Sequence, residues 1–456
     1  MAEDDDDSAR PPTSRGGGRR RFLLITAAVL AFFLLAGGVV AWLGYRKLDG
    51  NIETDATTGQ LLQHDASDRP DRGPVEAENI LLIGSDDRSG ANAAYGYAGG
   101  RRSDTTILLH LSADRRHATA VSIPRDAMVR VPACELPDGT RTQSRFMQFN
   151  WAFEAGGPAC TIRTVEQLSG IRIDHHLILD FTGFKQMVDA VGGVEVCVPR
   201  AIHDKDAQLD LPAGRQTLGG EQALGYVRVR ETLGDGSDTQ RMGRQQQFLA
   251  SLIRKVQSQG VLLNPARLWP LLNAATTAIT ADEGLSRLGS LYDLAQDLRS
   301  MPAANMVFLT TPRRPYPGNW DRDQLVQPQT DQLFAALRAD RVVEVQPYQV
   351  TPSPTARATT SARPSARATA RATANARASA SPDAFAYADA FASPDPWAYA
   401  DPSAPAYEPA AGAAAAEDAA GATPFPDTPS ASGVPLPETS PTLEGRTADQ
   451  DLCAMH

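Results

Sequence analysis

An uncharged run from Phe22 to Tyr45 does most to decide what this chain can fold into. A helix of about 20 consecutive apolar residues spans the hydrocarbon core of a bilayer. A secretory signal has a shorter apolar centre and a small-residue cleavage site, whereas this run ends in Trp42, Tyr45, Arg46 and Lys47, which are typical interfacial anchors. The sequence therefore predicts a single transmembrane helix over 22–45. It disfavours a buried helix of a soluble protein, because such a helix rarely lacks a polar face over this length.

The charges on either side of the run predict its orientation. Four arginines precede it, namely Arg15, Arg19, Arg20 and Arg21, whereas only Arg46 and Lys47 follow it closely. Basic residues stay on the cytoplasmic side, so we expect residues 1–21 in the cytoplasm and the rest outside the cell membrane. This location conflicts with a transcriptional attenuator. The net charge of −10 also argues against a general nucleic-acid-binding protein.

Composition divides the remaining chain into three parts. Residues 46–77 are polar without periodicity, which predicts a juxtamembrane linker. Only residues 78–345 have the aliphatic runs, charges and turn residues of a packed core, enough for one large domain. Ala, Pro, Ser and Thr dominate residues 346–456 and branched aliphatic residues are few, so a disordered tail is expected there. A wall-associating tether is the functional alternative for this tail.

Short apolar runs alternate with helical stretches in residues 78–345. Strands are expected at NILLIGS (from Asn79), TTILLHL (Thr105), ATAVSI (Ala118), LILDF (near Leu177), VEVCVP (Val194), GYVRVRE (Gly225) and MVFLTT (Met306). Helices are expected at FKQMVDAVGG, at FLASLIRKVQSQG, and over 266–277 and 284–298. This order predicts an α/β domain built in α/β/α layers, with TTILLHL and ATAVSI joined as a hairpin.

The predicted hairpin brings charged residues together at the end opposite its turn. Asp104 immediately precedes one strand and Arg125 closely follows the other. Asp86 and Arg88 follow the strand NILLI, and ligands of α/β sheets tend to bind beyond strand ends. A surface turn with a local salt bridge is the ordinary explanation for either pair alone. The two pairs together favour a site.

Arginines concentrate further along the chain as well. Arg228 and Arg230 lie two residues apart, so in a strand they would share one face, where an anion between them relieves their repulsion. Arg241, Arg244 and Gln245 follow helical spacing in the first turn of an expected helix. Basic residues oppose the helix dipole there, which an anion also explains.

These arginines suit a diphosphate when they are taken as a set. Helix N-termini and arginine forks both bind phosphate oxygens. Asp86 and Asp104 are then surplus negative charge beside an anion unless a cation bridges them. Mg²⁺, or Mn²⁺ in its place, fits because it combines a few carboxylates with substrate phosphate oxygens. Taken singly, each arginine has a structural role more commonly than a functional one.

Several motifs, in this order along the chain, resemble the LytR-CpsA-Psr family, and in particular its actinobacterial members. They are NILLIGSDDRSG, RRSDTTILLHL, VSIPRD, the block from Gly156 to Pro199, LGGEQALGYVRVRE and RMGRQQQFL. The likeness covers about Asn79 to Val256 and does not include the separate C-terminal domain of some members. It implies an α/β/α domain whose pocket holds a polyprenyl pyrophosphate. It also implies a cell-wall phosphotransferase that moves a teichoic acid, capsule or arabinogalactan-like polymer onto peptidoglycan.

The resemblance also implies roles for individual residues. Asp86 and Asp104 would hold Mg²⁺, and six residues would contact the pyrophosphate: Arg88, Arg125, Arg228, Arg230, Arg241 and Gln245. Arg244 stands where the family pattern varies. Asp104 and Arg125 would serve catalysis, in which a peptidoglycan hydroxyl attacks the phosphorus nearer the polymer and releases polyprenyl phosphate. Two alternatives stay open: a regulator that binds pyrophosphate lipids without turnover, and a pyrophosphatase that uses water.

The four cysteines are Cys134, Cys160, Cys197 and Cys453, and the absence of a CxxC pair argues against a zinc site. Cys134 and Cys160 are able to form a disulfide in an exported domain, although the spacing does not fix the pairing. We expect these two to be joined because both flank a polar loop. Cys197 lies in the apolar run GGVEVCVP, so we expect it to stay reduced as a small buried residue.

Overall fold

The computed structural model describes residues 17–85, 103–205, 207–229, 238–258, 265–346, 442–450 and 453. Helix α1 (Gly17–Asp49) contains the predicted membrane span, and its part from Phe22 to Asp49 is long and apolar enough to cross a bilayer. The large apolar side chains from Phe22 to Leu43 are exposed, as expected of a surface made for lipid. The helix therefore agrees with the prediction and continues a few residues past it.

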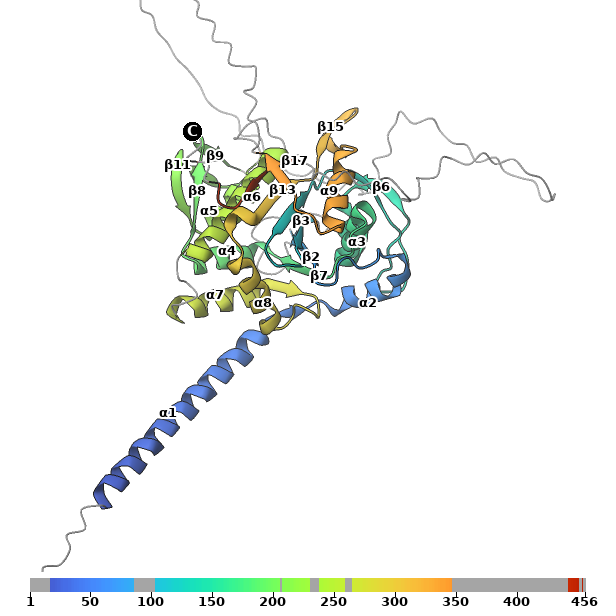
Figure 1. Ribbon diagram of the computed structural model, residues 1–456. Coiled ribbons are helices and arrows are strands. Elements are labelled where there is room, and N and C mark those ends of the chain that lie inside the picture. Colours follow the sequence, from blue (N-terminus) through green and yellow to red (C-terminus); the bar gives the residue numbers. More distant parts are fainter. Residues whose placement is uncertain are drawn as a thin grey trace, which may run out of the picture. The chain divides into compact units, whose positions relative to one another are not determined.

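A nine-stranded mixed sheet forms the centre of the domain (Figure 1). In spatial order its strands are β1 (Glu53–Thr54), β12 (Ile279–Ala281), β7 (His175–Leu179), β2 (Glu78–Ser85), β3 (Ser103–Leu111), β4 (Ala118–Ile123), β13 (Met306–Thr310), β17 (Thr442–Thr447) and β16 (Glu344–Gln346). Strands β2, β3 and β4 are antiparallel neighbours, so the predicted hairpin is confirmed. Strand β7 runs parallel to β2, and β13 runs parallel to β4.

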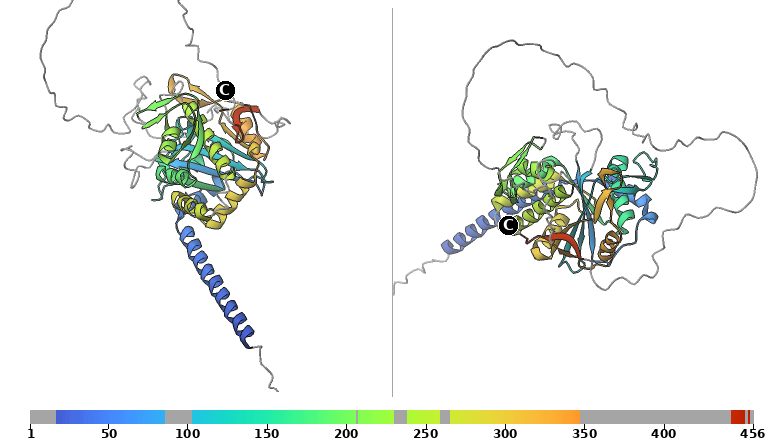
Figure 2. Two further views of the ribbon diagram at one scale, coloured as in Figure 1. Left: turned by 90° about the vertical axis from the view of Figure 1, so that its left-hand side faces the viewer. Right: turned by 90° about the horizontal axis from the view of Figure 1, so that it is seen from above.

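Helices cover both faces of this sheet (Figure 2). One face is covered by α2 (Ala56–His64), α3 (Trp151–Ser169) and α9 (Gln329–Arg338). The other face is covered by α6 (Asp238–Ser258) and α8 (Leu288–Ser300). Three more helices pack on the same side as α6: α4 (Phe181–Ala190), α5 (Gly220–Arg228) and α7 (Pro265–Ala278). Strand β2 shows why both faces are covered. Leu81 and Ile83 face the first layer, whereas Ile80 and Leu82 face the second, because successive side chains of a strand alternate. The predicted α/β/α layering is confirmed.

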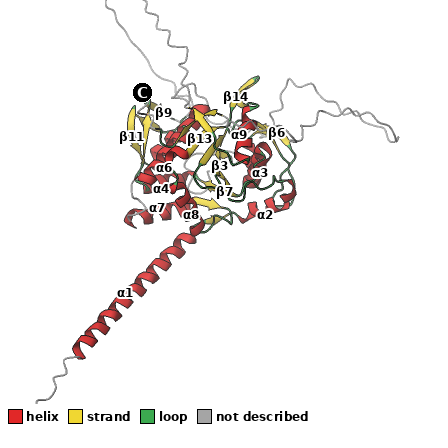
Figure 3. Ribbon diagram, in the orientation of Figure 1, coloured by secondary structure: helices red, strands yellow, loops and turns green. Residues whose placement is uncertain are grey.

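Four two-stranded sheets surround the central one (Figure 3). They pair β5 (Met128–Val131) with β6 (Arg145–Gln148), β8 (Val194–Val198) with β11 (Gly214–Leu218), β9 (Ile202–Asp204) with β10 (Leu209–Leu211), and β14 (Arg313–Tyr316) with β15 (Asn319–Leu325). Short 3₁₀ helices occupy Ala66–Asp68 and Ala303–Asn305. The sheet β5–β6 lies close to the functional site because β5 follows β4 after only four residues.

The prediction of a strand at GYVRVRE is wrong, because Gly225 to Arg228 form the last turn of helix α5. The preceding residues Glu221 to Leu224 are good helix formers, and the helix begins just after Gly219. Tyr226 is fully buried with Ala223 in the cluster between α4, α5 and α6. Tertiary burial at helical spacing thus outweighs the strand preference of the valines, and the argument that Arg228 and Arg230 share a strand face no longer holds.

The expected linker over 46–77 also needs correction, because much of this segment packs into the domain. Strand β1 pairs with β12, and Leu61 and Leu62 of α2 are buried in the core. Asp55 accepts a hydrogen bond from the backbone N–H of Thr58 at 3.0 Å and lies 3.2 Å from Nε2 of His176. Burial alone would raise the pKa of Asp55, but the hydrogen bonds from His176 and Thr58 lower this pKa to about 2. Elements this short carry too little periodicity to be predicted.

The end of the expected tail belongs to the domain as well. Strand β17 pairs with both β13 and β16, so residues 442–447 complete the sheet. The fit is close at Gly445, where a Cβ atom would lie 2.7 Å from the carbonyl oxygen of Phe308 and 2.7 Å from Val345. Residues 347–441, which the tail prediction also covers, lie outside the described residues.

Two disulfides are present. Cys134 and Cys160 are joined, as predicted. Cys197 is joined to Cys453, so the expectation that Cys197 stays reduced is wrong. Its side chain is only half-buried in β8, and the chain end that follows β17 reaches it.

Removing the second disulfide should destabilise the domain. Replacing Cys197 and Cys453 together with alanine should lower the free energy of unfolding by roughly 2–5 kcal/mol, because the bond closes a long loop of the unfolded chain. Chemical denaturation of the oxidised wild-type and double-mutant proteins measures this difference. Equal stabilities, or a free thiol at Cys197 in the wild-type protein, would contradict the pairing.

Candidate functional site

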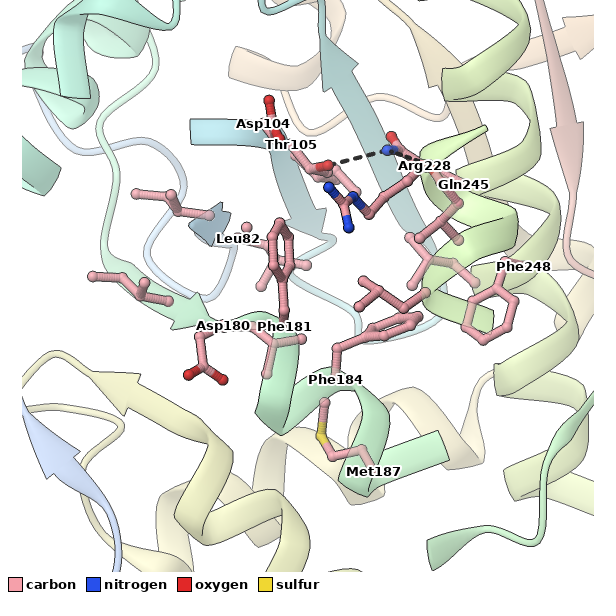
Figure 4. Close-up of a pocket in the computed structure, with 18 of the residues that line it drawn as sticks. Leu82, Asp104, Thr105, Asp180, Phe181, Phe184, Met187, Arg228, Gln245 and Phe248 are labelled. Atoms are coloured by element: carbon pink, nitrogen blue, oxygen red, sulfur yellow. Dashed lines mark hydrogen bonds between the residues drawn. The ribbon is translucent and has the colours of Figure 1, made fainter. Parts of the chain in front are cut away.

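A cavity of about 510 Å³ lies between the sheet and helices α4, α5 and α6 (Figure 4). Most of its wall is apolar: Leu82, Ile83, Ile107, Leu177, Ile178, Leu179, Phe181, Phe184, Met187, Ala207, Leu224, Val227, Phe248, Leu249 and Ile279. Its polar lining residues include Asp104, Thr105, Arg228, Arg241 and Gln245, which come from β3, α5 and α6. The space therefore suits a ligand with an apolar chain and a polar head.

An irregularity in the sheet positions Asp104. Gly84 pairs with Thr105 and Ser85 pairs with Ser103, so Asp104 is the extra residue of a β-bulge between β2 and β3. Bulges next to active sites commonly turn a side chain out of the regular alternation of a strand. The carbonyl oxygen of Asp104 accepts a hydrogen bond from Nη2 of Arg241 at 3.3 Å. The bulge thus connects β3 to the first turn of α6.

Arg125 contacts Asp104, as the hairpin prediction requires. Its Nη1 donates to Oδ1 of Asp104 at 2.7 Å, and its Nε donates to Oδ2 of Asp126 at 3.2 Å. Asp126 in turn accepts from Nε2 of Gln148 at 3.0 Å. The side chains of Arg125 and Asp104 are 16% and 27% exposed, so the pair is only partly screened by solvent. Two carboxylates therefore fix the orientation of one guanidinium.

Three residues that the sequence predicted line the cavity together with Asp104, whereas Arg125 contacts Asp104 without being one of the lining residues. Arg241 is buried, and Gln245 donates to Oγ1 of Thr105 at 3.2 Å and to the carbonyl of Val227 at 3.3 Å. Arg228, at the end of α5, places its guanidinium 4.9 Å from the ring centre of Phe181, within cation–π distance. The guanidinium groups of α5 and α6 thus come together with Asp104 although they lie far from it in sequence.

Arg244 does not line the cavity, and its Nη2 donates instead to the carbonyl of Val229. It therefore supports the end of α5, and the phosphate contact considered for it has no support in this geometry. Asp86, Arg88 and Arg230 lie outside the described residues. The roles expected of these three residues remain predictions.

Helix α4 supplies cavity residues that were not predicted from the sequence. Phe181, Phe184 and Met187 follow helical spacing and all line the wall. This pattern predicts an apolar helix face but does not show whether another side chain or a cavity lies against it. Asp180 also lines the cavity, and its carboxylate accepts from the backbone N–H of Gly183 at 2.7 Å as the N-cap of α4.

Two other polar groups near the cavity have structural partners. Asp204 accepts a hydrogen bond from the backbone N–H of Ala207 at 2.9 Å. Tyr226 is fully buried, donates to Oε1 of Gln247 at 3.1 Å, and has its pKa raised to about 12 by burial. A neutral phenol of this kind is unsuited to act as a base at physiological pH.

The donor groups around the cavity bear on the predicted metal site. Within the described part of the chain, no group of three or more His, Cys, Asp or Glu side chains could hold a metal ion. Mg²⁺ commonly uses only one or two carboxylates and completes its coordination with substrate phosphate oxygens and water. Asp104, at the polar end of the cavity, fits a metal of this kind.

The fold and the site define a class of protein in which an α/β/α domain encloses a mainly apolar cavity with basic groups and a carboxylate at one end. Residues 45–339 match the model of the LytR_cpsA_psr family, and the chain belongs to this family. The match begins within α1, includes α2 and extends to the end of α9, which supports counting the supposed linker as part of the domain.

Relatives were found among curated proteins and solved structures. The probable cell wall biosynthesis protein LcpB of Corynebacterium glutamicum is 40% identical over 45% of this chain and 48% of its own length. The cell wall biosynthesis protein LcpA of the same species is 35% identical over 55% of this chain and 52% of its own length. The chain therefore spans about half the length of these curated relatives.

Teichoic acid transferases are also similar. The polyisoprenyl-teichoic acid–peptidoglycan teichoic acid transferase TagV of Bacillus subtilis is 34% identical over 40% of this chain and 44% of its own length. The crystal structure of TagV from this species aligns with a TM-score of 0.46 and 25% identity, covering 59% of this chain and 99% of that one.

Proposed function

We propose that the chain is a membrane-anchored phosphotransferase, oriented with its domain outside the cell, that moves a glycopolymer from a polyprenyl pyrophosphate carrier onto peptidoglycan. The observation that carries this proposal is the cavity, whose wall is mainly apolar and whose polar residues include two arginines and a carboxylate. A polyprenyl pyrophosphate has the same division between an apolar chain and a charged head. The names of the relatives, which include a transferase of teichoic acid to peptidoglycan, support the same reaction class.

In this proposal the prenyl chain lies against the apolar wall and the pyrophosphate lies among Arg125, Arg228, Arg241 and Asp104. Arginine forks form strong, directional hydrogen bonds to phosphate oxygens. Arg125 is already oriented by Asp104 and Asp126, so little side-chain ordering is required when the pyrophosphate binds. The charged head is thereby positioned at the bulge of β3.

Asp104 would hold Mg²⁺ or Mn²⁺ through its carboxylate, and a bound divalent ion would neutralise charge on the pyrophosphate. A hydroxyl of peptidoglycan would attack the phosphorus nearer the polymer and give up its proton to solvent. The bond between this phosphorus and the bridging oxygen would break, and polyprenyl phosphate would leave. Arg125 and Arg241 would stabilise the negative charge that grows on the leaving phosphate, as cationic side chains do in other phosphoryl transfers.

One experiment separates transfer from its two alternatives. The full chain in lipid nanodiscs should move a labelled oligosaccharide from a polyprenyl pyrophosphate donor onto added peptidoglycan fragments when Mg²⁺ is present. Labelled oligosaccharide phosphate released into solution would instead identify a pyrophosphatase. Donor that binds but is not consumed would identify a binding regulator.

A further inference from the structure

We propose that helices α7 and α8 form a face that lies on the bilayer surface, so that the end of the cavity at β12 is held on the membrane side of the domain. This membrane-contacting face is defined by Trp269 and Pro270 of α7 and Tyr292 of α8, all of which are exposed. Its partner is the same bilayer that α1 crosses. Both helices contact the end of α1.

The end of α1 is fixed directly to both helices (Figure 1). A Cβ atom on Gly44 would lie 3.0 Å from the ring of Trp269, so the absence of a side chain at Gly44 allows the indole to approach α1. Nδ2 of Asn51 lies 3.3 Å from Oδ1 of Asn273 and 3.2 Å from Oγ1 of Thr276, both in α7. At the start of α8, the backbone N–H of Leu288 donates to Asp49 at 2.9 Å. These contacts set the height of α7 and α8 relative to the bilayer.

That height corresponds to the lipid headgroups. Trp42, Tyr45 and Arg46 lie within four residues of Gly44, and the guanidinium of Arg46 is 5.1 Å from the ring centre of Trp42. Trp and Tyr prefer the boundary between hydrocarbon and water, where one end of the ring is apolar and the other is hydrated. Trp269 contacts α1 at this level, so its ring belongs to the same belt of interfacial aromatic residues.

The exposure of the two aromatic residues favours lipid over water. Trp269 is 42% exposed and Tyr292 is 56% exposed, although leucines of the same two helices pack inward: Leu271 of α7 and Leu288, Leu291, Leu294 and Leu298 of α8. Outside α1, only a few described positions carry a large apolar side chain with this degree of exposure. Trp269 and Tyr292 are two of them, and both lie on helices that contact α1. A bilayer would cover both rings without requiring another protein.

The cavity extends toward this face across the strands of the sheet. Thr105 at its polar end pairs with Gly84, Gly84 pairs with Leu179, and Leu179 pairs with Ile279. These four residues all line the cavity, so it runs from β3 through β2 and β7 to β12. Three strand spacings separate the two ends by about 14 Å. Ile279 directly follows α7, so the far end of the cavity lies at the end of the helix that carries Trp269, about 15 Å along the helix axis from this residue.

Helix α7 also packs on the apolar wall itself. Its Leu271 contacts the cluster that contains Phe248 and Phe184, and Ala278 lies so close to α4 that a Cβ atom on Gly183 would be 2.4 Å from its Cβ. If the proposed function is right, a prenyl chain would pass from the bilayer into the cavity without crossing water. The membrane-contacting face itself does not depend on that function.

Tryptophan fluorescence of the full chain in nanodiscs tests the face. With lipids brominated near the headgroup, the Trp269→Phe variant should lose part of the quenchable emission, as the Trp42→Phe variant should. Trp320→Phe is the matched control, because Trp320 is 86% exposed on β15, a strand of the β14–β15 hairpin, and should be unquenched. Adding Tyr292→Trp to Trp269→Phe should restore quenching, which also guards against a local folding defect at Trp269.

Quenching of Trp42 without quenching of Trp269 or of the tryptophan introduced at 292 would overturn the proposal. Cross-links between the α7 helices of two copies in that case would assign the face to a second copy of the chain. None of these outcomes depends on polymer transfer. Failure of the membrane-contacting face can therefore be distinguished from failure of the proposed reaction.

Discussion

Replacing Asp104 with asparagine should reduce polymer transfer by roughly 10²-fold or more, in line with the loss of one electrostatic group at a reacting centre. The side chain keeps its shape but loses the charge that would hold Mg²⁺. Binding of the lipid carrier should change much less, because Arg125, Arg228 and Arg241 remain. Steady-state transfer rates and equilibrium binding of a polyprenyl pyrophosphate, measured on the same full-chain preparation, separate the two effects.

The matched control is Asp180→Asn, because Asp180 also lines the cavity but accepts a hydrogen bond from Gly183 as an N-cap. Asparagine caps helices as well as aspartate does, so transfer should be unchanged in this variant.

A chelator should abolish transfer by the wild-type protein. The double variant with Asp86→Ala and Asp104→Ala should transfer polymer little more slowly than either single variant, since both carboxylates would serve one ion. Full transfer in excess chelator would show that Asp104 holds no metal and only orients Arg125.

Replacing Arg125 with alanine should weaken binding of polyprenyl pyrophosphate by roughly 10- to 100-fold, because a hydrogen bond to a charged group contributes about 1.5–3 kcal/mol. The change also leaves Asp104 and Asp126 without the guanidinium that lies between them. The pyrophosphate would then meet less positive charge. Isothermal titration of the detergent-solubilised full chain with the carrier lipid measures the loss.

Arg130→Ala provides the control for general charge, because Arg130 is an exposed arginine on the nearby strand β5. Carrier affinity should be unchanged in that variant. Arg125→Lys should recover only part of the affinity, since an ammonium cannot reproduce the planar fork of hydrogen bonds. Equal affinities of Arg125→Ala and wild type would remove Arg125 from the binding site.

Local patterns were sufficient to predict part of the site. Asp104 and Arg125 are 21 residues apart and meet because they flank two consecutive antiparallel strands. Two short β-rich runs separated by a turn form a hairpin, so the residues before the first strand and after the second meet at the end opposite the turn. Arg241 and Gln245 were predictable for a similar reason, since helical spacing carried both of them onto the inward side of α6.

Features that depend on distant contacts were not predictable. Burial of Tyr226 between helices decides that GYVR is helical, although its valines favour a strand. Cys453 reaches Cys197 only because β17 joins the sheet beside β13, far away in sequence. The cavity itself is the space that α4, α5 and α6 leave above the sheet, which depends on packing that one helix face does not encode.

The return of the chain end to the sheet has a topological consequence for residues 347–441. Strand β16 ends at Gln346, and strand β17, which pairs with β16, begins at Thr442. Cys453, which is joined to Cys197, follows β17. The chain is therefore held in the sheet immediately before and immediately after this segment. A single proteolytic cut between residues 347 and 441 would leave two polypeptides that are still covalently joined through Cys197 and Cys453. The domain would keep strand β17 after such a cut.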